Sequence, residues 1–152
     1  LFVEIARLQL PYFIPKECIV KVNESGYEPD VIVLNRQTIG ADTRWEKEST
    51  ITRGESAKLV IEIVSTNWSD DYALKLEDYE ALGIEEYWIC DYLGLCGKRY
   101  FGSPKQPTFS VYRLDAACTY QCRQFRGQQR IESAIFPELQ LSLAQILSVL
   151  QA

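Results

Sequence analysis

The chain has 152 residues with 47% hydrophobic and 24% charged residues, and its net charge is −5. This length suffices for one domain with a hydrophobic core. No apolar run approaches the roughly 20 residues of a membrane span, and no secretory signal is visible. The sequence contains no histidine, which excludes Ser-His-Asp triads and histidine-bound metals. Any catalysis must therefore use carboxylates, lysine, tyrosine or cysteine.

The N-terminal half predicts one helix, two strands and a loop. Apolar residues at helical spacing predict a helix over residues 1–10. Short strands are predicted over residues 18–22 and 31–34 from their apolar, β-branched content. Residues 35–54 are polar and contain two glycines, so we expect a long loop there.

The C-terminal half begins with a strand–helix–strand unit. A strand over residues 59–64 precedes a helix that starts near residues 67–70 and ends at Gly83, and a strand over 87–92 follows. This order favours a parallel strand pair with a right-handed crossover. A hairpin over 109–114 and 119–125 and an amphipathic helix over 141–150 complete the chain. We expect one α/β domain, residues 1–152, with a central mixed β-sheet flanked by helices.

Five cysteines are present, an odd number, and none forms a CxxC pair. Without histidine, this spacing does not make a zinc site. Reduced thiols are the expected state, and they indicate a cytoplasmic protein.

Positive charge is concentrated in one segment of this acidic chain. Between Lys98 and Arg130 there are seven basic residues and one acidic residue, Asp115. The segment is either a solvated hairpin face or a surface that faces phosphate groups. In the second case, the DNA contacts would include Arg123, Arg126 and Arg130.

Glu62 interrupts the most strand-like segment, Leu59 to Ser65. An unpaired buried carboxylate costs several kcal/mol, so a partner is required. If the strand that starts at Asp30 is a neighbour, the two carboxylates can share one divalent cation, and the backbone carbonyl of Ile63 can add a ligand. Oxygen ligands suit Mg²⁺ or Mn²⁺. Lys75, on the following helix, would then stabilise charge on a phosphate or activate a water.

Simpler interpretations exist for each residue. Asp30 follows Pro29 and can mark a turn-to-strand junction. Glu62 can face water on an edge strand. Lys75 can be a solvated helix residue or the i,i+4 partner of Asp71. A further possibility is a small-molecule or protein interaction domain in which Glu62 pairs with Lys75 as a structural ion pair.

Several short motifs in this order resemble the Uma-two restriction endonuclease family, which belongs to the PD-(D/E)xK nuclease superfamily. The resemblance covers roughly residues 27–150. The motifs are Pro29-Asp30, Glu62-Ile63-Val64-Ser65, Asp71 to Tyr79, Gly83 to Asp91, Ser110 to Arg113, Ile131 to Ser133, and Phe136 to Leu139.

The resemblance implies a restriction-endonuclease-like fold with a Mg²⁺ or Mn²⁺ site at one edge. It carries over Asp30 and Glu62 as metal ligands. The superfamily lysine stands two residues after the glutamate, where this chain has Val64, and Lys75 is the matching residue on the next helix. Glu4 is the candidate acid of the first helix, or else a surface residue. We also expect that an N-terminal part of the family domain precedes Leu1.

The activity implied is metal-dependent hydrolysis of DNA phosphodiester bonds by an endonuclease. Because cleavage of two strands often needs two sites, we expect a homodimer. The alternative is a catalytically inactive nuclease-like module with a binding or regulatory role.

Overall fold

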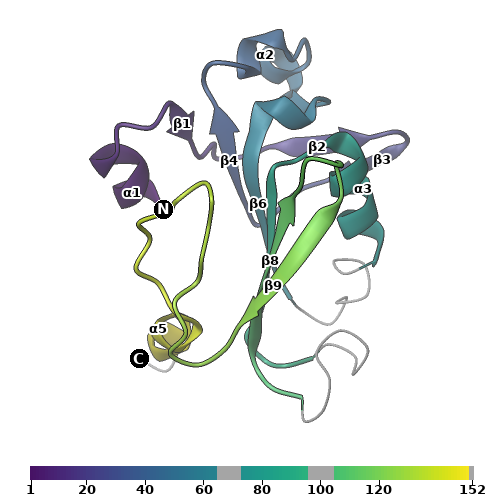
Figure 1. Ribbon diagram of the computed structural model, residues 1–152. Helices are drawn as coiled ribbons and strands as arrows, with labels where there is room; N and C mark the ends of the chain where they lie inside the picture. Colours follow the sequence, from purple (N-terminus) through teal and green to yellow (C-terminus); the bar gives the residue numbers. More distant parts are fainter. Residues whose placement is uncertain (65–72, 96–104, 151–152) are drawn as a thin grey trace.

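The computed structural model describes residues 1–64, 73–95 and 105–150. A six-stranded mixed sheet in the order β1-β4-β6-β7-β8-β9 forms the centre of the fold (Figure 1). A smaller sheet in the order β3-β2-β5 lies beside it. The strands are β1 (Tyr12–Phe13), β2 (Ile19–Val22), β3 (Ser25–Tyr27), β4 (Val31–Asn35), β5 (Thr50–Ile51), β6 (Ala57–Ile63), β7 (Glu86–Asp91), β8 (Thr108–Leu114) and β9 (Tyr120–Phe125).

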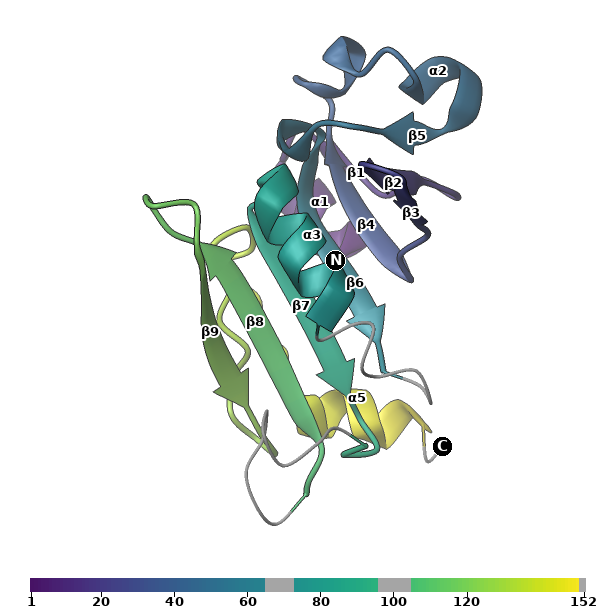
Figure 2. The same cartoon turned by 90° about the vertical axis from the view of Figure 1, so that its right-hand side faces the viewer.

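Helices cover both faces of the large sheet (Figures 1 and 2). They are α1 (Phe2–Arg7), α2 (Trp45–Glu48), α3 (Lys75–Leu82) and α5 (Leu143–Leu150), with single 3₁₀ turns η1 (Ile39–Ala41) and η2 (Gly54–Ser56). The predicted helices near the two ends of the chain, the hairpin and the central strands are confirmed. The predicted start of α3, near residues 67–70, lies outside the described residues.

The strand pair β6–β7 is parallel, with Glu62 opposite Ile89, whereas the other pairs of the large sheet are antiparallel. α3 connects these two parallel strands, as the strand–helix–strand order predicts. It ends at Gly83, whose φ of 86° is the left-handed conformation that glycine adopts without strain.

Two hydrophobic clusters lie on opposite faces of the large sheet. We call them the α3 face and the α5 face. On the α3 face, Val60 and Val64 pack in one cluster with Tyr79 and Tyr87. On the α5 face, the neighbouring residues of β6 pack with Trp88, with the C-terminal segment and with residues of α1 and α5. Each strand thus sends alternate residues to two different cores.

The prediction of a long loop over residues 35–54 is wrong. This segment contains η1, α2, β5 and the start of η2. It is organised around Asp42, which is 3% exposed and accepts hydrogen bonds from the Thr52 amide and the Thr52 and Ser56 hydroxyls. Single turns and two-residue strands are too short to produce a detectable hydrophobic period.

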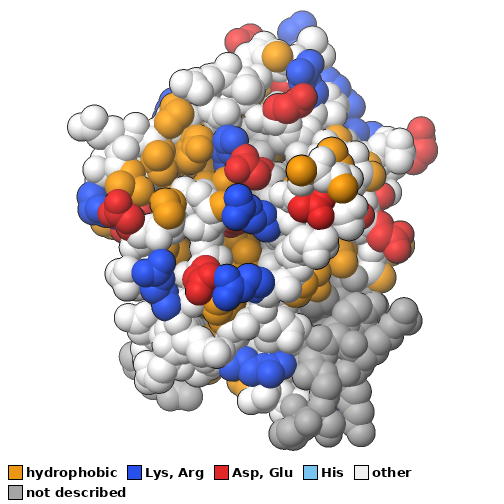
Figure 3. Space-filling view, viewed as in Figure 1, with side chains coloured by type: hydrophobic (Ala, Val, Ile, Leu, Met, Phe, Trp, Pro, Cys, Tyr) orange, Lys and Arg blue, Asp and Glu red, His pale blue; other side chains and the backbone are white. Residues whose placement is uncertain are grey.

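Charges of both signs alternate over the face seen in Figure 3, and apolar side chains gather near α1 and β1. Phe2 and Val3 of α1 are 68% and 73% exposed. The thiols of Cys18, Cys90, Cys118 and Cys122 are free, as predicted, and Cys96 lies outside the described residues. Within the described part of the chain, no helix combines the length and apolarity needed to span a membrane.

Candidate active site

Glu62 projects from the middle of the sheet toward α3. Val60 of β6 and Val64, which follows the strand, belong to the α3 face, while Leu59 and Ile61 belong to the α5 face. Because side chains alternate along a strand, Glu62 shares the face of Val60 and Val64. It is 3% exposed, so its carboxylate depends on protein partners rather than on bulk water.

The strand register brings Asp30 beside Glu62. β4 and β6 are antiparallel, with Val31 opposite Ile61. Continuing this register by one residue places Asp30 opposite Glu62, and directly opposed residues of antiparallel strands point to the same face. Ile63 supports this placement, because its backbone N–H donates to Asp30 Oδ2 at 2.7 Å.

Two residues of α3 contact the carboxylate of Glu62. The Lys75 ammonium lies 3.0 Å from Oε2, and the Tyr79 hydroxyl donates to Oε1 at 3.2 Å. Lys75 and Tyr79 are four residues apart and so share one line of the helix. The charge inside the hydrophobic strand is therefore partnered: a cation meets one oxygen and a phenol meets the other.

The site is buried at one end and open at the other. Asp30 is exposed, and the side chain of Ile63 is 48% exposed. Glu62 is buried, and the side chain of Lys75 is only 18% exposed. A polar ligand would therefore meet Asp30 first and Glu62 behind it.

The donor set fits a hard cation. Asp30, Glu62 and the carbonyl of Ile63 offer oxygen atoms only, which are the ligands preferred by Mg²⁺ and Mn²⁺. Among the described residues, no group of three or more acidic or cysteine side chains could hold a metal ion. Two carboxylates are nevertheless enough for Mg²⁺, which keeps several waters and takes further ligands from substrate phosphates.

The three arginines predicted to contact DNA do not share one face. Arg126 donates to Thr108 Oγ1 at 3.1 Å and to Gln124 Oε1 at 3.3 Å. Side chains alternate between the two faces along a strand. Gln124 is four residues from Tyr120 in β9, so it points to the α3 face, which also carries Glu62.

Arg123 lies on the other face of β9. Its side chain is ion-paired with Glu132 and stacks over Phe125, with 5.6 Å from Cζ to the ring centroid. Arg130 donates to the carbonyl of Pro137 at 3.0 Å, within the C-terminal segment that packs on the α5 face. Only Arg126 of the three is therefore brought to the face that carries Glu62.

The other positions considered in the sequence lie away from the two carboxylates. Glu4 is in α1, where it is ion-paired with Arg7 at 2.8 Å. The helix packs on the α5 face through Leu1 and Ile5, on the opposite side of the sheet from α3 (Figure 1). Val64, which occupies the usual lysine position, is a core residue at 1% exposure.

A second buried glutamate was missed by the sequence reasoning. Glu86 is fully buried and accepts hydrogen bonds from the Trp88 indole at 2.9 Å, the Ser133 hydroxyl at 2.8 Å and the Ala134 amide at 2.5 Å. It shares the α5 face with Trp88. Two of its partners are 47 and 48 residues away in the sequence, so no local pattern could have revealed this role.

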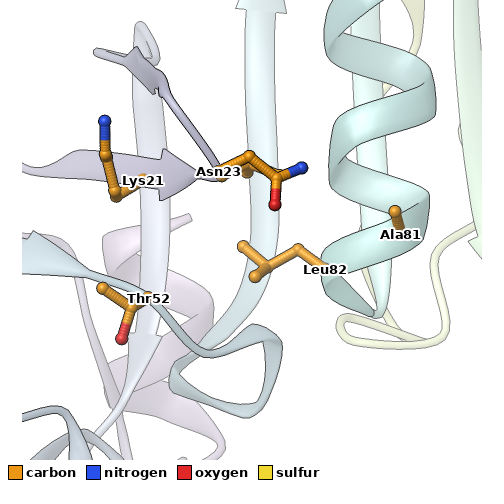
Figure 4. A pocket seen from close by; sticks show the side chains of 6 residues that line it. Lys21, Asn23, Thr52, Ala81 and Leu82 are labelled. Atoms are coloured by element: carbon orange, nitrogen blue, oxygen red, sulfur yellow. The ribbon is translucent and has the colours of Figure 1, made fainter.

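A cavity of about 380 Å³ lies at the other end of α3 (Figure 4). Lys21, Asn23 and Thr52 line one side, and Ala81 and Leu82 of α3 line the other. None of the residues that line it belongs to the acidic pair or contacts it. Lys75 is at the first turn of α3, whereas this cavity adjoins the last.

The family model Uma2, described as "Putative restriction endonuclease", matches residues 1–144. The chain therefore belongs to the Uma2 family, as the sequence motifs predict.

A solved structure supports the fold assignment. The chain is similar to a "putative nuclease belonging to DUF820" from Anabaena variabilis ATCC 29413, with a TM-score of 0.66 and 18% sequence identity over 96% of this chain and 73% of that chain. The predicted restriction-endonuclease-like fold is confirmed by this match. No curated protein matches the chain.

Proposed function

We propose that this protein is a metal-dependent endonuclease that hydrolyses phosphodiester bonds of DNA. The observation that carries the proposal is that Asp30, one residue beyond the pairing of Val31 with Ile61, accepts from the amide next to Glu62, and that the Lys75 ammonium lies 3.0 Å from Glu62. Two carboxylates and an ammonium are the groups that the nuclease superfamily uses. The family match and the fold agree with this chemistry.

Each residue has a defined part in the proposed reaction. Asp30, Glu62 and the Ile63 carbonyl would hold Mg²⁺ or Mn²⁺. The bound ion supplies Lewis-acid stabilisation of charge on the phosphate and lowers the pKa of a coordinated water. The Lys75 ammonium beside Glu62 would orient the attacking water and offset charge on the phosphoryl oxygens.

The test is a cleavage assay of the wild-type protein and its Glu62→Gln variant, with Mg²⁺ or Mn²⁺ and both single- and double-stranded DNA. Metal catalysis is worth several kcal/mol, so we expect the variant to lose about a hundredfold or more in rate. Asp30→Asn should behave similarly. Glu86→Gln is the matched control, because it neutralises the buried glutamate of the other face. Undiminished cleavage by Glu62→Gln would refute the proposal.

A second candidate is a catalytically inactive nuclease-like module. The observation in its favour is that Lys75 and Tyr79 contact both oxygens of Glu62 without any metal. In that case Glu62 and Lys75 form a structural ion pair, and Mg²⁺ adds little stability to the folded protein. A thermal shift titration with Mn²⁺ separates the candidates: a concentration-dependent increase in Tm favours the metal site.

DNA binding and dimerisation belong to the same proposal. Arg126 is the strongest candidate for a phosphate contact, because it reaches the face of Glu62. β9 is three strands from β6, which corresponds to roughly 14 Å at the usual strand spacing. A homodimer would place two such sites on the two strands of a duplex. The free thiols support a cytoplasmic location.

A further inference from the structure

We infer that Tyr79 is a positioning residue for the metal-binding carboxylate: its hydroxyl fixes the orientation of Glu62. This inference rests on the proposed function, since it assigns Glu62 as a metal ligand. The hydroxyl donates to Glu62 Oε1 at 3.2 Å, while Lys75 contacts Oε2 at 3.0 Å. Sequence reasoning treats Tyr79 as a core residue of the apolar helix stripe, and a role for its hydroxyl was not expected.

The hydroxyl of Tyr79 has a fixed place because its ring is held on two sides. Tyr27 and Tyr87 make edge-to-face contacts with the ring, with centroid separations of 5.6 and 5.0 Å. Tyr27 is itself anchored, since its hydroxyl donates to Asp78 Oδ2 at 2.5 Å. Tyr79 is fully buried. A donor held in this way favours one orientation of the carboxylate that it contacts.

Two contacts hold Glu62 from the side of α3. Tyr79 contacts one oxygen of the carboxylate and Lys75 contacts the other. Because both oxygens are contacted from the helix, the orientation of the carboxylate relative to Asp30 is restricted.

Packing alone does not require the hydroxyl. Phenylalanine would preserve the contacts with Tyr27 and Tyr87, so the ring accounts for the core role of this position. The hydroxyl is the part that reaches Glu62. The substitution Tyr79→Phe therefore separates positioning of the carboxylate from filling of the core.

Tyr120→Phe is a matched control. Tyr120 lies in the same core cluster, is 9% exposed, and donates its hydroxyl to the Ile84 carbonyl at 2.8 Å. Its removal costs one buried hydrogen bond, as in Tyr79→Phe, but does not touch Glu62. Both variants should lose a similar amount of thermal stability.

The experiment measures Mn²⁺ affinity by calorimetric titration of the wild-type protein, Tyr79→Phe and Tyr120→Phe, without DNA. Loss of an outer partner of a metal ligand weakens affinity about tenfold to a hundredfold. We expect a loss of about tenfold in Tyr79→Phe and an unchanged Kd in Tyr120→Phe. In the Glu62→Gln background, Tyr79→Phe should have little further effect, because the residue that it positions is no longer a carboxylate.

The results distinguish this inference from the proposed function. If the wild-type protein binds Mn²⁺ and Tyr79→Phe binds it equally well, the positioning role is overturned and the proposed function stands. If the wild-type protein does not bind Mn²⁺, both fail. If Tyr120→Phe weakens binding as much as Tyr79→Phe, the effect reflects general stability and the positioning role is also overturned.

Discussion

Glu62 and Glu86 are buried glutamates on adjacent parallel strands that point to opposite faces of the sheet. Glu86 accepts from three neutral donors, two of them in the C-terminal segment. Glu62 is contacted by an ammonium and a phenol, and an exposed carboxylate, Asp30, lies just before the neighbouring strand. Burial of a carboxylate therefore does not mark a functional site by itself. The charge of its partners and its access to a second acid separate a candidate site from a structural anchor.

The largest effect on stability is expected at Glu86. Glu86→Ala leaves the Trp88 indole, the Ser133 hydroxyl and the Ala134 amide without their acceptor. Each unsatisfied buried donor costs about 1–3 kcal/mol, so we expect a loss of about 3 kcal/mol or more. Urea unfolding measures it. Ser133→Ala removes one donor and should lose only about 1 kcal/mol. A loss of Mn²⁺ affinity in folded Glu86→Ala would contradict the division between the two faces.

The next largest loss of stability is expected when Lys75 is replaced. Removing one partner of a buried ion pair costs about 3–5 kcal/mol, because the other charge is left uncompensated. We expect Lys75→Met to lose about 3 kcal/mol in metal-free buffer and to recover part of this with Mn²⁺.

Lys58→Met is the control for this prediction. Lys58 is ion-paired with Glu85 at 2.5 Å, but the two side chains are 25% and 43% exposed. A pair of this kind contributes about 1 kcal/mol or less. Equal losses of unfolding free energy in both variants would show that the environment of Glu62 has no special electrostatic character.

A smaller effect is expected on DNA affinity, and it shows which face of the sheet binds DNA. In a Glu62→Gln background, which should prevent the proposed cleavage, Arg126→Gln should weaken DNA binding by about 1 kcal/mol, or roughly fivefold, and reduce the salt slope by about one. Arg123→Gln, on the α5 face, should leave both nearly unchanged. Fluorescence anisotropy at several salt concentrations measures this. The reverse ranking would place the DNA on the face of Glu86.

The smallest effect at neutral pH concerns the buried thiols. Burial raises the pKa of Cys18 to about 12 and that of Cys90 to about 11. The folded state thus binds these protons more tightly than the unfolded state does. The resulting stability is complete below about pH 9 and is lost as the pH rises toward 11 and 12.

Thiol labelling measures how accessible these cysteines are in the folded protein. At pH 8, exposed Cys118 should react within the native protein, whereas Cys18 and Cys90 should react only on unfolding. Rapid labelling of Cys90 in the native protein would show that the α5 face opens locally.

Sequence patterns predicted the parts of the fold that are long or periodic. The strands β4, β6, β7 and β8 are short runs rich in apolar residues, and the parallel crossover followed from the order strand, helix, strand. β1, β3 and β5 contain only two or three residues, so they have no measurable period and depend on pairing with distant strands.

The candidate site was predictable to a similar extent. Asp30 and Glu62 could be selected because a charge inside a strand needs a partner, and Lys75 because it follows on the next helix. The hydroxyl of Tyr79 was not predictable, since a tyrosine on an apolar helix stripe gives no sign of where its oxygen points. Arg126 and Arg123 lie on different faces because side chains alternate along β9. Which residues of β9 point to which face becomes clear only once the strand pairing is known.

Lys75 is the first residue of α3, and it contacts a carboxylate held in the sheet. Opening of this first helical turn would take the ammonium away from Glu62 and leave a negative charge in an apolar setting. Opening of this turn would thereby be penalised by electrostatics, and a cation that replaced the ammonium would relieve that penalty. Under the proposed metal binding, opening of the first turn of α3 would therefore be thermodynamically linked to occupancy of the ion site beside Asp30.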